Sequence, residues 1–441
     1  MSESLLSVGV DVGTTSTQMV LSRLSIENRA GAFSVPEMEI EGREILYKSP
    51  VHFTPLLHDD LVDADALRDL VDREYAAAGI TKAEVNTGAV IITGETSRKE
   101  NARAVLDALA GYAGDFVVAT AGPDLESVLA AKGAGAAEYS AKTGKRILHM
   151  DIGGGTSNLA LIEDGRIIAT SCLNIGGRLL KIGPEGRLRY VSPVLAGIFH
   201  KKAGEVVNRE EVYELSERLV QALEAAAGLR EESEWMRSLR TAGTAGFPPP
   251  EDAMISFSGG VADCIDSRKS WLAFGDMGPE LGQAIRGSRL CGKAYMLGAE
   301  TIRATVIGAG CHSAQLSGST VFYQNIEFPL KNLPVVHSVE ALQTLDDSGV
   351  LVLGALHAPS YRQLRELAEN IAREIGGRML ILAMERDMAK ALGQCLALRM
   401  GADARILCID RVRLQEQSYL DIGAPVGPAL PVVIKTLVLS R

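Results

Sequence analysis

The chain has 441 residues, of which 46% are hydrophobic and only 5% aromatic. This length suffices for two or three domains with sizeable cores. Lys and Arg total 45 against 55 for Asp and Glu, and the net charge of −10 argues against a protein that coats nucleic acid. The first residues lack the pattern of a secretion signal, and no apolar run approaches the roughly 18 residues of a membrane span. We therefore expect a cytoplasmic protein with neither nucleic acid nor membrane as a partner.

The first third of the chain mixes predicted strands and helices. Residues 5–12 and 17–24 are apolar segments joined by a short polar turn, which predicts a hairpin. A helix is predicted from its N-cap candidate Asp63 to Gly79, because apolar residues recur on one helical face between them. Further elements are expected at residues 90–92 (strand), 102–109 (helix), 116–119 (strand) and 124–137 (Ala-rich helix).

The remainder continues the same mixture. Strands are expected at residues 147–151, 158–163 and 167–172, and the pair Asp164-Gly165 favours a type I′ turn between the last two. Later elements are expected at residues 211–226 (helix), 254–257 (strand), 361–375 (helix), 379–383 (strand) and 388–398 (helix). This order of elements predicts an α/β fold.

One short theme occurs twice, in residues 8–16 and 149–157. In both segments a buried strand ends in Asp and is followed by any residue, a Gly, further Gly or hydroxyl residues, and a second strand. Glycines allow a tight turn that brings backbone N–H groups against phosphate oxygens, hydroxyls add donors, and the Asp can hold hydrated magnesium. One such turn is unspecific, but two copies about 140 residues apart predict a paired phosphate site.

Other nucleotide motifs are incomplete. Residues 287–293 match the spacing of a P-loop, yet Ala294 occupies the position where that motif needs Ser or Thr for magnesium. Residues 308–310 lack the third glycine of a dinucleotide fingerprint. The two Asp-containing turns therefore remain the candidate nucleotide site.

These two turns resemble the phosphate 1 and phosphate 2 motifs of the superfamily that unites actin, sugar kinases and heat-shock chaperone ATPases. The resemblance implies a two-lobed actin-like fold, with ribonuclease-H-type lobes at residues 1–145 and 146–441 and with ATP and Mg²⁺ between them. It implies that Asp11 and Asp151 act around the metal in catalysis. It also implies that the phosphates are held by Gly13, Thr14, Thr15, Gly153, Gly154, Gly155 and Thr156.

Two further site assignments follow from the same resemblance. Residues 126–135 are similar to the superfamily's connecting helix, which makes Glu126 the candidate to orient the attacking water. The segment lacks the proline that often follows this acid, and a solvent-facing helix carboxylate is the alternative. A Gly-Gly turn after a strand usually borders the adenosine. The first candidate for that turn is the pair Gly259 and Gly260, and the second is Gly308 with Gly310.

Several longer segments resemble the EutA family, the reactivating factors of ethanolamine ammonia-lyase, which is an adenosylcobalamin enzyme. These segments are residues 9–18, 92–102, 150–158, 256–264, 303–310, 385–394, 420–423 and 431–437. The resemblance implies a chaperone-like ATPase of ethanolamine utilization that exchanges damaged cobalamin on the lyase for intact coenzyme. It implies ATP and Mg²⁺ as cofactors, and a cytoplasmic location that includes a bacterial microcompartment as an option.

Rival functions stay open at this point, because the fold superfamily hosts many activities. A small-molecule kinase would need an additional carboxylate base beside an acceptor pocket, and no segment indicates one. A filament-forming actin relative would assemble through head-to-tail contacts, and an ATP-binding adaptor would bind without hydrolysis. No His, Cys and carboxylate cluster has the spacing of a corrinoid ligand set, so we do not expect permanently bound cobalamin.

Overall fold

The computed structural model forms two compact units. Unit 1 consists of Met1–Ile92, Thr96–Thr120 and Gly310–Arg441, and unit 2 consists of Thr93–Glu95 and Ala121–Ala309. The structure describes residues 3–13, 16–28, 38–58, 61–93, 105, 109, 118–120, 123–241, 252–312, 314–316, 321–343, 349–354, 359–375, 377–412, 414, 418–425 and 430–436.

The first sheet of unit 1 has the strand order β3-β2-β1-β7-β8, with β4 beside β2. Strand β2 runs antiparallel to both β3 and β1, whereas β7 and β8 are parallel to β1. The bounds are β1 (Glu3–Val12), β2 (Ser16–Asn28), β3 (Met38–Lys48), β4 (His52–Phe53), β7 (Thr87–Ile92) and β8 (Val118–Thr120), with a small hairpin of β5 (Leu56–His58) and β6 (Leu61–Val62). The predicted N-terminal hairpin is thus confirmed.

Helix α1 (Ala64–Ala78) packs on this sheet. The Asp63 side chain accepts a hydrogen bond from the Ala66 N–H, and Gly79 adopts φ 69°. These are the N-cap and the left-handed C-terminal residue that end a helix cleanly, so the predicted helix is confirmed. The predicted helix at 102–109 lies almost wholly outside the described residues.

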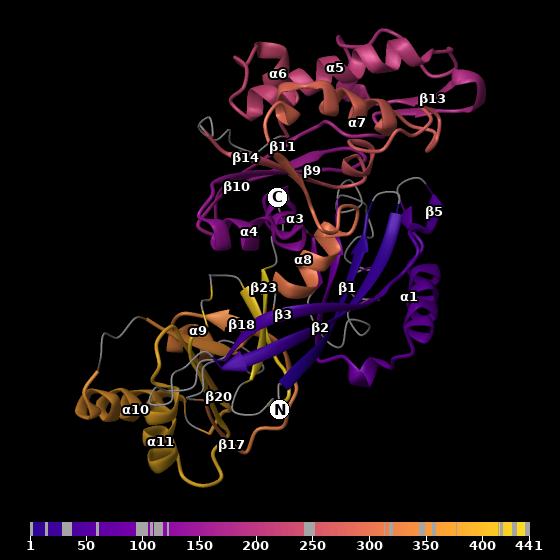
Figure 1. Cartoon of the computed structure of the whole chain (residues 1–441). Coiled ribbons are helices and arrows are strands. Elements are labelled where there is room, and N and C mark those ends of the chain that lie inside the picture. The colour runs from indigo at the N-terminus through magenta and orange to yellow at the C-terminus, as the bar shows by residue number, and fades with distance from the viewer. Residues whose placement is uncertain are drawn as a thin grey trace. The chain divides into compact units, whose positions relative to one another are not determined.

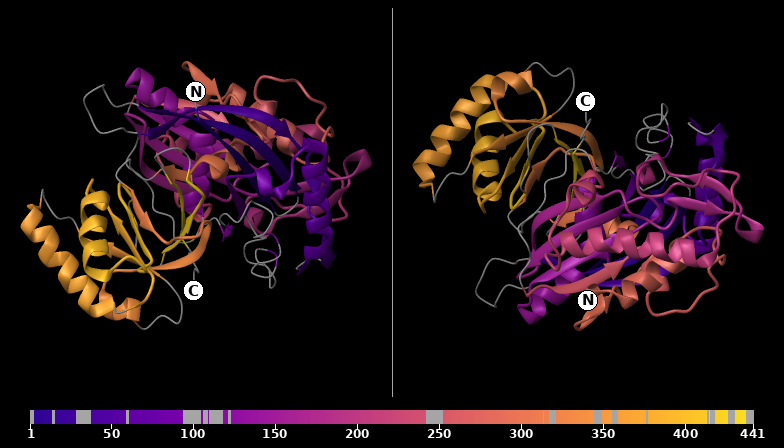
Figure 2. Two further views of the ribbon diagram at one scale, coloured as in Figure 1. Left: turned by 90° about the horizontal axis from the view of Figure 1, so that it is seen from below. Right: turned by 90° about the horizontal axis from the view of Figure 1, so that it is seen from above.

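The second sheet of unit 1 has the order β16-β23-β22-β18-β19-β20-β21-β17. Strands β18 to β21 are parallel and adjacent in chain order, so all their connecting helices lie on one face. Both views of Figure 2 show these orange helices on one side of the orange and yellow strands. The bounds are β16 (Ala314–Leu316), β17 (Phe322–Gln324), β18 (Leu330–Val336), α9 (Val339–Gln343), β19 (Val350–Leu353), α10 (Tyr361–Ile375), β20 (Leu380–Met384), α11 (Ala389–Met400), β21 (Ile406–Ile409), β22 (Ser418–Ile422) and β23 (Pro431–Thr436).

Unit 2 contains one five-stranded sheet in the order β11-β10-β9-β14-β15. Strands β9, β10 and β11 form an antiparallel meander, and β14 and β15 run parallel to β9. This is the arrangement of β3-β2-β1-β7-β8 repeated, and it is the ribonuclease-H-type topology that the sequence resemblance implied. The bounds are β9 (Ile147–Ile152), β10 (Ser157–Glu163), β11 (Arg166–Leu173), β14 (Met254–Ser258) and β15 (Tyr295–Leu297), with a separate hairpin of β12 (Leu180–Ile182) and β13 (Leu188–Val191).

Helices cover both faces of the unit 2 sheet. Helices α3 (Pro123–Gly133) and α4 (Ala136–Thr143) lie on one face, and α5 (Arg209–Ala226), α6 (Glu234–Ser238) and α7 (Gly278–Gly287) lie on the other (Figure 1). Helix α8 (Ala304–His312) begins in unit 2, which ends at Ala309. The single helix expected at 124–137 is two helices, because Gly135 adopts φ 80° between them. The predicted type I′ turn is confirmed by positive φ at Asp164 and Gly165.

The compact units differ from the lobes expected at residues 1–145 and 146–441. Helices α3 and α4, expected in the first lobe, pack against β9, β10 and β11 of unit 2. Residues from Gly310 onward, expected in the second lobe, belong to unit 1. The first difference arises because α3 and α4 cover the sheet of the strand that follows them, β9. The second arises because the chain returns to unit 1 after α8 begins. Both depend on contacts between distant residues, so no short sequence pattern predicts them.

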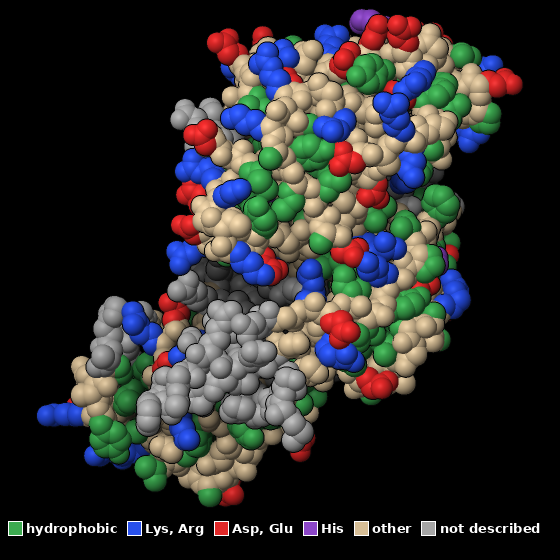
Figure 3. Space-filling model, in the orientation of Figure 1, with side chains coloured by type: hydrophobic (Ala, Val, Ile, Leu, Met, Phe, Trp, Pro, Cys, Tyr) green, Lys and Arg blue, Asp and Glu red, His purple; other side chains and the backbone are tan. Residues whose placement is uncertain are grey.

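The distribution of charged side chains and the apolarity of the helices are relevant to the partners of this protein. On the face shown in Figure 3, Lys and Arg side chains are interspersed with Asp and Glu side chains. Within the part of the chain that the structure describes, no helix is both long enough and apolar enough to cross a bilayer.

Candidate functional site

The first predicted turn closes the hairpin of β1 and β2 in unit 1. Asp11 is the next-to-last residue of β1, lies opposite Gln18 across the hairpin and neighbours Ile91 of β7. The Gly13 N–H donates to the Ser16 carbonyl at 2.9 Å, and the Thr54 hydroxyl donates to the Gly13 carbonyl at 2.7 Å. Thr14 and Thr15, predicted to hold phosphate, lie outside the described residues.

The second predicted turn closes the hairpin of β9 and β10 in unit 2 with the same design. Asp151 is again the next-to-last residue of its strand and lies opposite an amide side chain, that of Asn158. The Gly153 N–H donates to the Thr156 carbonyl at 2.9 Å, which is the counterpart of the Gly13 bond. Gly154 and Gly155 expose backbone at the tip of the turn. The geometry of this tip suits contact between backbone N–H groups and an anion.

A loop that the sequence analysis missed lies against this second turn. The Arg178 N–H donates to the Gly154 carbonyl at 2.6 Å, and a Cβ at Gly176 would lie 2.4 Å from the same carbonyl oxygen. Only glycine therefore permits the approach at residue 176. The Arg178 side chain runs beside Gly154, and its Nε lies 3.5 Å from an Asp276 carboxylate oxygen. This places a cation beside the glycine turn, and the Gly-Gly-Arg run after β11 is the signal that could have found it.

Asp151 is buried among hydroxyl groups. Its Oδ1 accepts a hydrogen bond from Ser258 at 2.5 Å, and its Oδ2 lies 3.5 Å from the Thr305 hydroxyl. Burial raises the pKa of Asp151 to about 6, although both hydroxyl contacts act in the opposite direction. The Asp151 carboxylate is thus surrounded by hydroxyl oxygens and lies at a strand end next to a glycine turn. Oxygen ligands of this kind suit a hard cation.

A histidine lies behind this carboxylate. His149 Nε2 is 2.9 Å from the Ser258 hydroxyl, and His149 Nδ1 is 3.1 Å from the Ser256 hydroxyl. Burial lowers the pKa of His149 to about 3, so the ring is neutral at neutral pH. None of these three residues was predicted as a site residue, because the contacts join different strands.

Glu126 lies on α3, next to the same hairpin. Its Oε2 accepts a hydrogen bond from the Asn158 side chain at 2.8 Å, and the residue is only 7% exposed. The alternative of a solvent-facing carboxylate is therefore wrong. Because Asn158 lies opposite Asp151, the two predicted carboxylates flank one hairpin strand of unit 2.

The two candidates for the adenosine turn have different structures. Gly259 follows β14 with φ 86°, and a Cβ there would lie 2.3 Å from the Ile152 carbonyl oxygen, so the turn lies against the end of β9. Gly260 is next to it, and a Cβ there would make an ordinary contact with the Ile302 side chain at 3.9 Å. Gly308 and Gly310 lie inside α8, so the strand end expected there is wrong. A Cβ at Gly308 would lie 1.9 Å from the Leu129 carbonyl oxygen, and helix packing explains this glycine.

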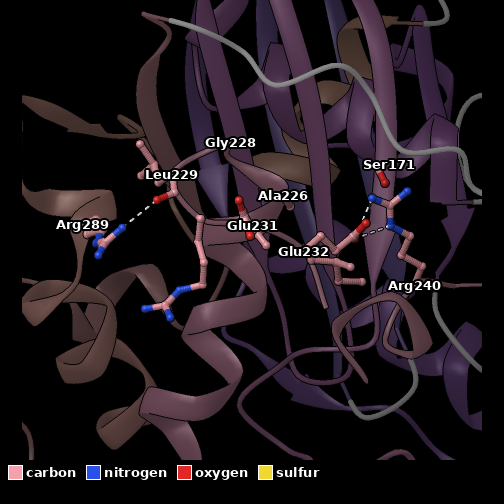
Figure 4. A pocket seen from close by; sticks show the side chains of 11 residues that line it. Ser171, Ala226, Gly228, Leu229, Glu231, Glu232, Arg240 and Arg289 are labelled. Carbon is pink, nitrogen blue, oxygen red and sulfur yellow. Dashed lines mark hydrogen bonds and ion pairs between the residues drawn. The ribbon is translucent and has the colours of Figure 1, made fainter. Parts of the chain in front are cut away.

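A separate cavity of about 650 Å³ lies beside the C-terminal end of α5 (Figure 4). Arginines line it, but each already has a partner: Arg240 pairs with Glu232 at 2.7 Å, and Arg289 donates to the Leu229 carbonyl at 2.8 Å. Arg230 pairs with the buried Glu224 at 3.0 Å. These contacts tie α5 to its neighbouring loops, and none of the predicted site residues lines the cavity.

Two ribonuclease-H-type sheets, each with an Asp followed by a tight turn in its first hairpin, define the class of actin-like ATPase folds. The family model described as "Ethanolamine utilisation protein EutA" matches residues 3–440. The chain therefore belongs to the EutA family.

Two relatives, each 37% identical to the chain, agree with this family. The chain is 37% identical to "Ethanolamine ammonia-lyase reactivase EutA" of Salmonella typhimurium over 470 residues, and 37% identical to the protein of that name from Escherichia coli over 465 residues. Both alignments cover 98% of each chain. Among solved structures, ethanolamine utilization protein EutJ from Carboxydothermus hydrogenoformans is similar with a TM-score of 0.35 and 20% identity, covering 70% of this chain and 89% of that one.

Proposed function

We propose that this protein is an ATP-dependent reactivating factor for ethanolamine ammonia-lyase. In this role it releases damaged cobalamin from the lyase, so that intact adenosylcobalamin can rebind during ethanolamine utilization. The observation that carries the proposal is family membership along the whole chain, since the two relatives named as reactivases are matched over 98% of their length. This favours the reactivase over the kinase and the filament former.

We propose that the two turns bind the phosphates of ATP. Gly13, Thr14 and Thr15 would contribute from unit 1, and residues 153–156 would contribute from unit 2 with Arg178 beside them. Asp11 and Asp151 would hold Mg²⁺, which neutralises phosphate charge when bound. In the described ranges no cluster of three or more His, Cys, Asp or Glu side chains could hold a metal. A pair of carboxylates suits Mg²⁺, because this ion keeps several waters and takes further ligands from phosphates.

The remaining site residues have proposed roles in hydrolysis and in base binding. Glu126 would orient the attacking water, and its contact with Asn158 would fix the carboxylate for that task. Gly259 and Gly260 would border the adenosine, in preference to Gly308 and Gly310, because the latter two lie within a helix. The proposed location is the cytoplasm, including a bacterial microcompartment within it.

Reactivation requires that ATP discriminate between two conformations of this protein. A nucleotide that binds both conformations with equal affinity cannot shift their populations. We propose that the ATP-bound and ADP-bound forms bind the lyase differently, and that this difference favours a form of the lyase from which damaged cofactor dissociates.

The test is recovery of lyase turnover after inactivation by hydroxocobalamin. The inactivated lyase is incubated with this protein, ATP, Mg²⁺ and fresh adenosylcobalamin. We expect recovery that depends on ATP, and we expect the Asp11→Ala and Asp151→Ala variants to slow it by at least about tenfold, because each removes a ligand of the metal.

The matched control is Asp65→Ala, which removes an exposed carboxylate on α1. This variant should reactivate the lyase as fast as the wild type. Recovery that persists in both site variants would disprove the metal assignment, and ATP binding without any recovery would disprove the reactivase.

A further inference from the structure

Unit 2 buries a row of three polar side chains behind Asp151. Ser256, His149 and Ser258 are fully buried, and they lie in contact in that order, with Ser258 next to Asp151. Burying polar groups is unfavourable unless each one finds a hydrogen-bond partner. The row satisfies this condition, since every neighbouring pair is 2.5 to 3.1 Å apart.

The direction of these hydrogen bonds follows from counting donors. An ionised Asp151 carboxylate only accepts, so the single O–H of Ser258 points to it. The Ser258 oxygen then accepts from His149 Nε2, which must carry the ring proton of a neutral imidazole. His149 Nδ1 is consequently an acceptor and receives the O–H of Ser256. The carboxylate thus sets the direction of the Ser258 hydroxyl, and the His149 N–H holds the Ser258 oxygen from the other side.

The fold itself does not require this row, because the first sheet of unit 1 lacks it. Asp11 neighbours Ile91 on the adjacent parallel strand, where Asp151 neighbours Ser258. Gly9 pairs with Ala89 at the positions where His149 pairs with Ser256. The same strand order is thus built without any buried hydroxyl or imidazole at these positions, which argues against a purely structural role.

We infer that His149 is a positioning residue that acts through Ser258 to fix the Asp151 carboxylate for cation binding. The inference rests on the proposed function, in which Asp151 binds Mg²⁺ with ATP. Asp151 is thereby held in place before the cation arrives.

The test measures Mg²⁺ affinity directly. Mg²⁺ is titrated calorimetrically into protein saturated with a non-hydrolysable ATP analogue, and the melting temperature is recorded for each variant. His149→Leu and Ser258→Ala should each raise the Mg²⁺ Kd about tenfold. Ser258→Ala removes the hydrogen bond to the Asp151 carboxylate, and His149→Leu removes the N–H that holds the Ser258 hydroxyl in place. His149→Gln keeps an N–H donor near the Nε2 position and should stay within about threefold of the wild type.

Ser216→Ala is the matched control, since it removes a buried hydroxyl of unit 2 that donates to the Val212 carbonyl. It should alter stability without altering the Mg²⁺ Kd. If His149→Leu and Ser258→Ala lower the melting temperature but leave the Kd within twofold, the row is structural and the inference is overturned. Failure of the wild type to bind Mg²⁺ with the analogue would instead reject the proposed nucleotide site, and the inference with it.

Discussion

At the scale of single residues, Asp410 shows how burial sets the properties of a carboxyl group. It follows β21 and accepts a hydrogen bond from the Ala389 N–H at the start of α11, at 3.3 Å. Burial is the main cause that raises the pKa of Asp410 to about 6, and nearby Asp387 acts in the same direction. Arg411 opposes this shift but is engaged with Asp387, at 2.6 and 2.7 Å.

This shift predicts a pH-dependent stability. Below pH 4 the group is protonated in both the folded and the unfolded chain. As the pH rises from about 4 to 6, the unfolded chain ionises first, so the folded state loses stability relative to it. The melting temperature of the wild type should therefore fall relative to that of Asp410→Asn across this range and level off above pH 7. A difference between the two curves that stays constant with pH would contradict the assignment.

At the scale of secondary-structure elements, α3 and α8 approach so closely that two glycines are needed. A Cβ at Gly133 would lie 1.7 Å from the Ala304 carbonyl oxygen, and one at Gly308 would lie 1.9 Å from that of Leu129. The contact matters beyond packing, because α3 carries Glu126 and α8 carries Thr305.

We predict that Gly308→Ala destabilises the protein by about 1–3 kcal/mol, since the added methyl group forces the two backbones apart. Denaturant unfolding followed by helical circular dichroism would measure the loss. Gly377→Ala is the matched control, because a Cβ there meets nothing within 4 Å, and its stability should lie within about 0.5 kcal/mol of the wild type. Equal stability of both variants would mean that α8 can move away from α3 without loss.

Sequence patterns predicted those elements whose capping or turn residues lie next to one another in the chain. The cap at Asp63 and the left-handed Gly79 delimit α1, and the Asp164-Gly165 turn fixes the hairpin of β10 and β11. The two Asp-containing turns were found for the same reason, as their residues are contiguous. The helix α8 was missed, because a short apolar run with glycines does not distinguish a strand from a helix. Arg178 and His149 were missed because their contacts are tertiary.

At the scale of the whole molecule, the proposed site draws residues from both compact units, and this can be tested. Hydrogen exchange with and without Mg²⁺ and a non-hydrolysable ATP analogue should show protection at residues 13–16 and at residues 153–156. If one nucleotide contacts both turns, Asp151→Ala should abolish protection at both. Protection at residues 13–16 that survives this variant would show that the two turns bind separate ligands.

The repeated strand order has a consequence for how the protein can be altered by mutation. The two sheets share their strand order, the place of the aspartate and the backbone hydrogen bond that closes the turn. They differ on the strand beside the aspartate, where one has Ala89 and Ile91 and the other has Ser256 and Ser258. Each sheet therefore serves as an internal reference for the other, because a residue exchanged at one position has a structural counterpart at the matching position.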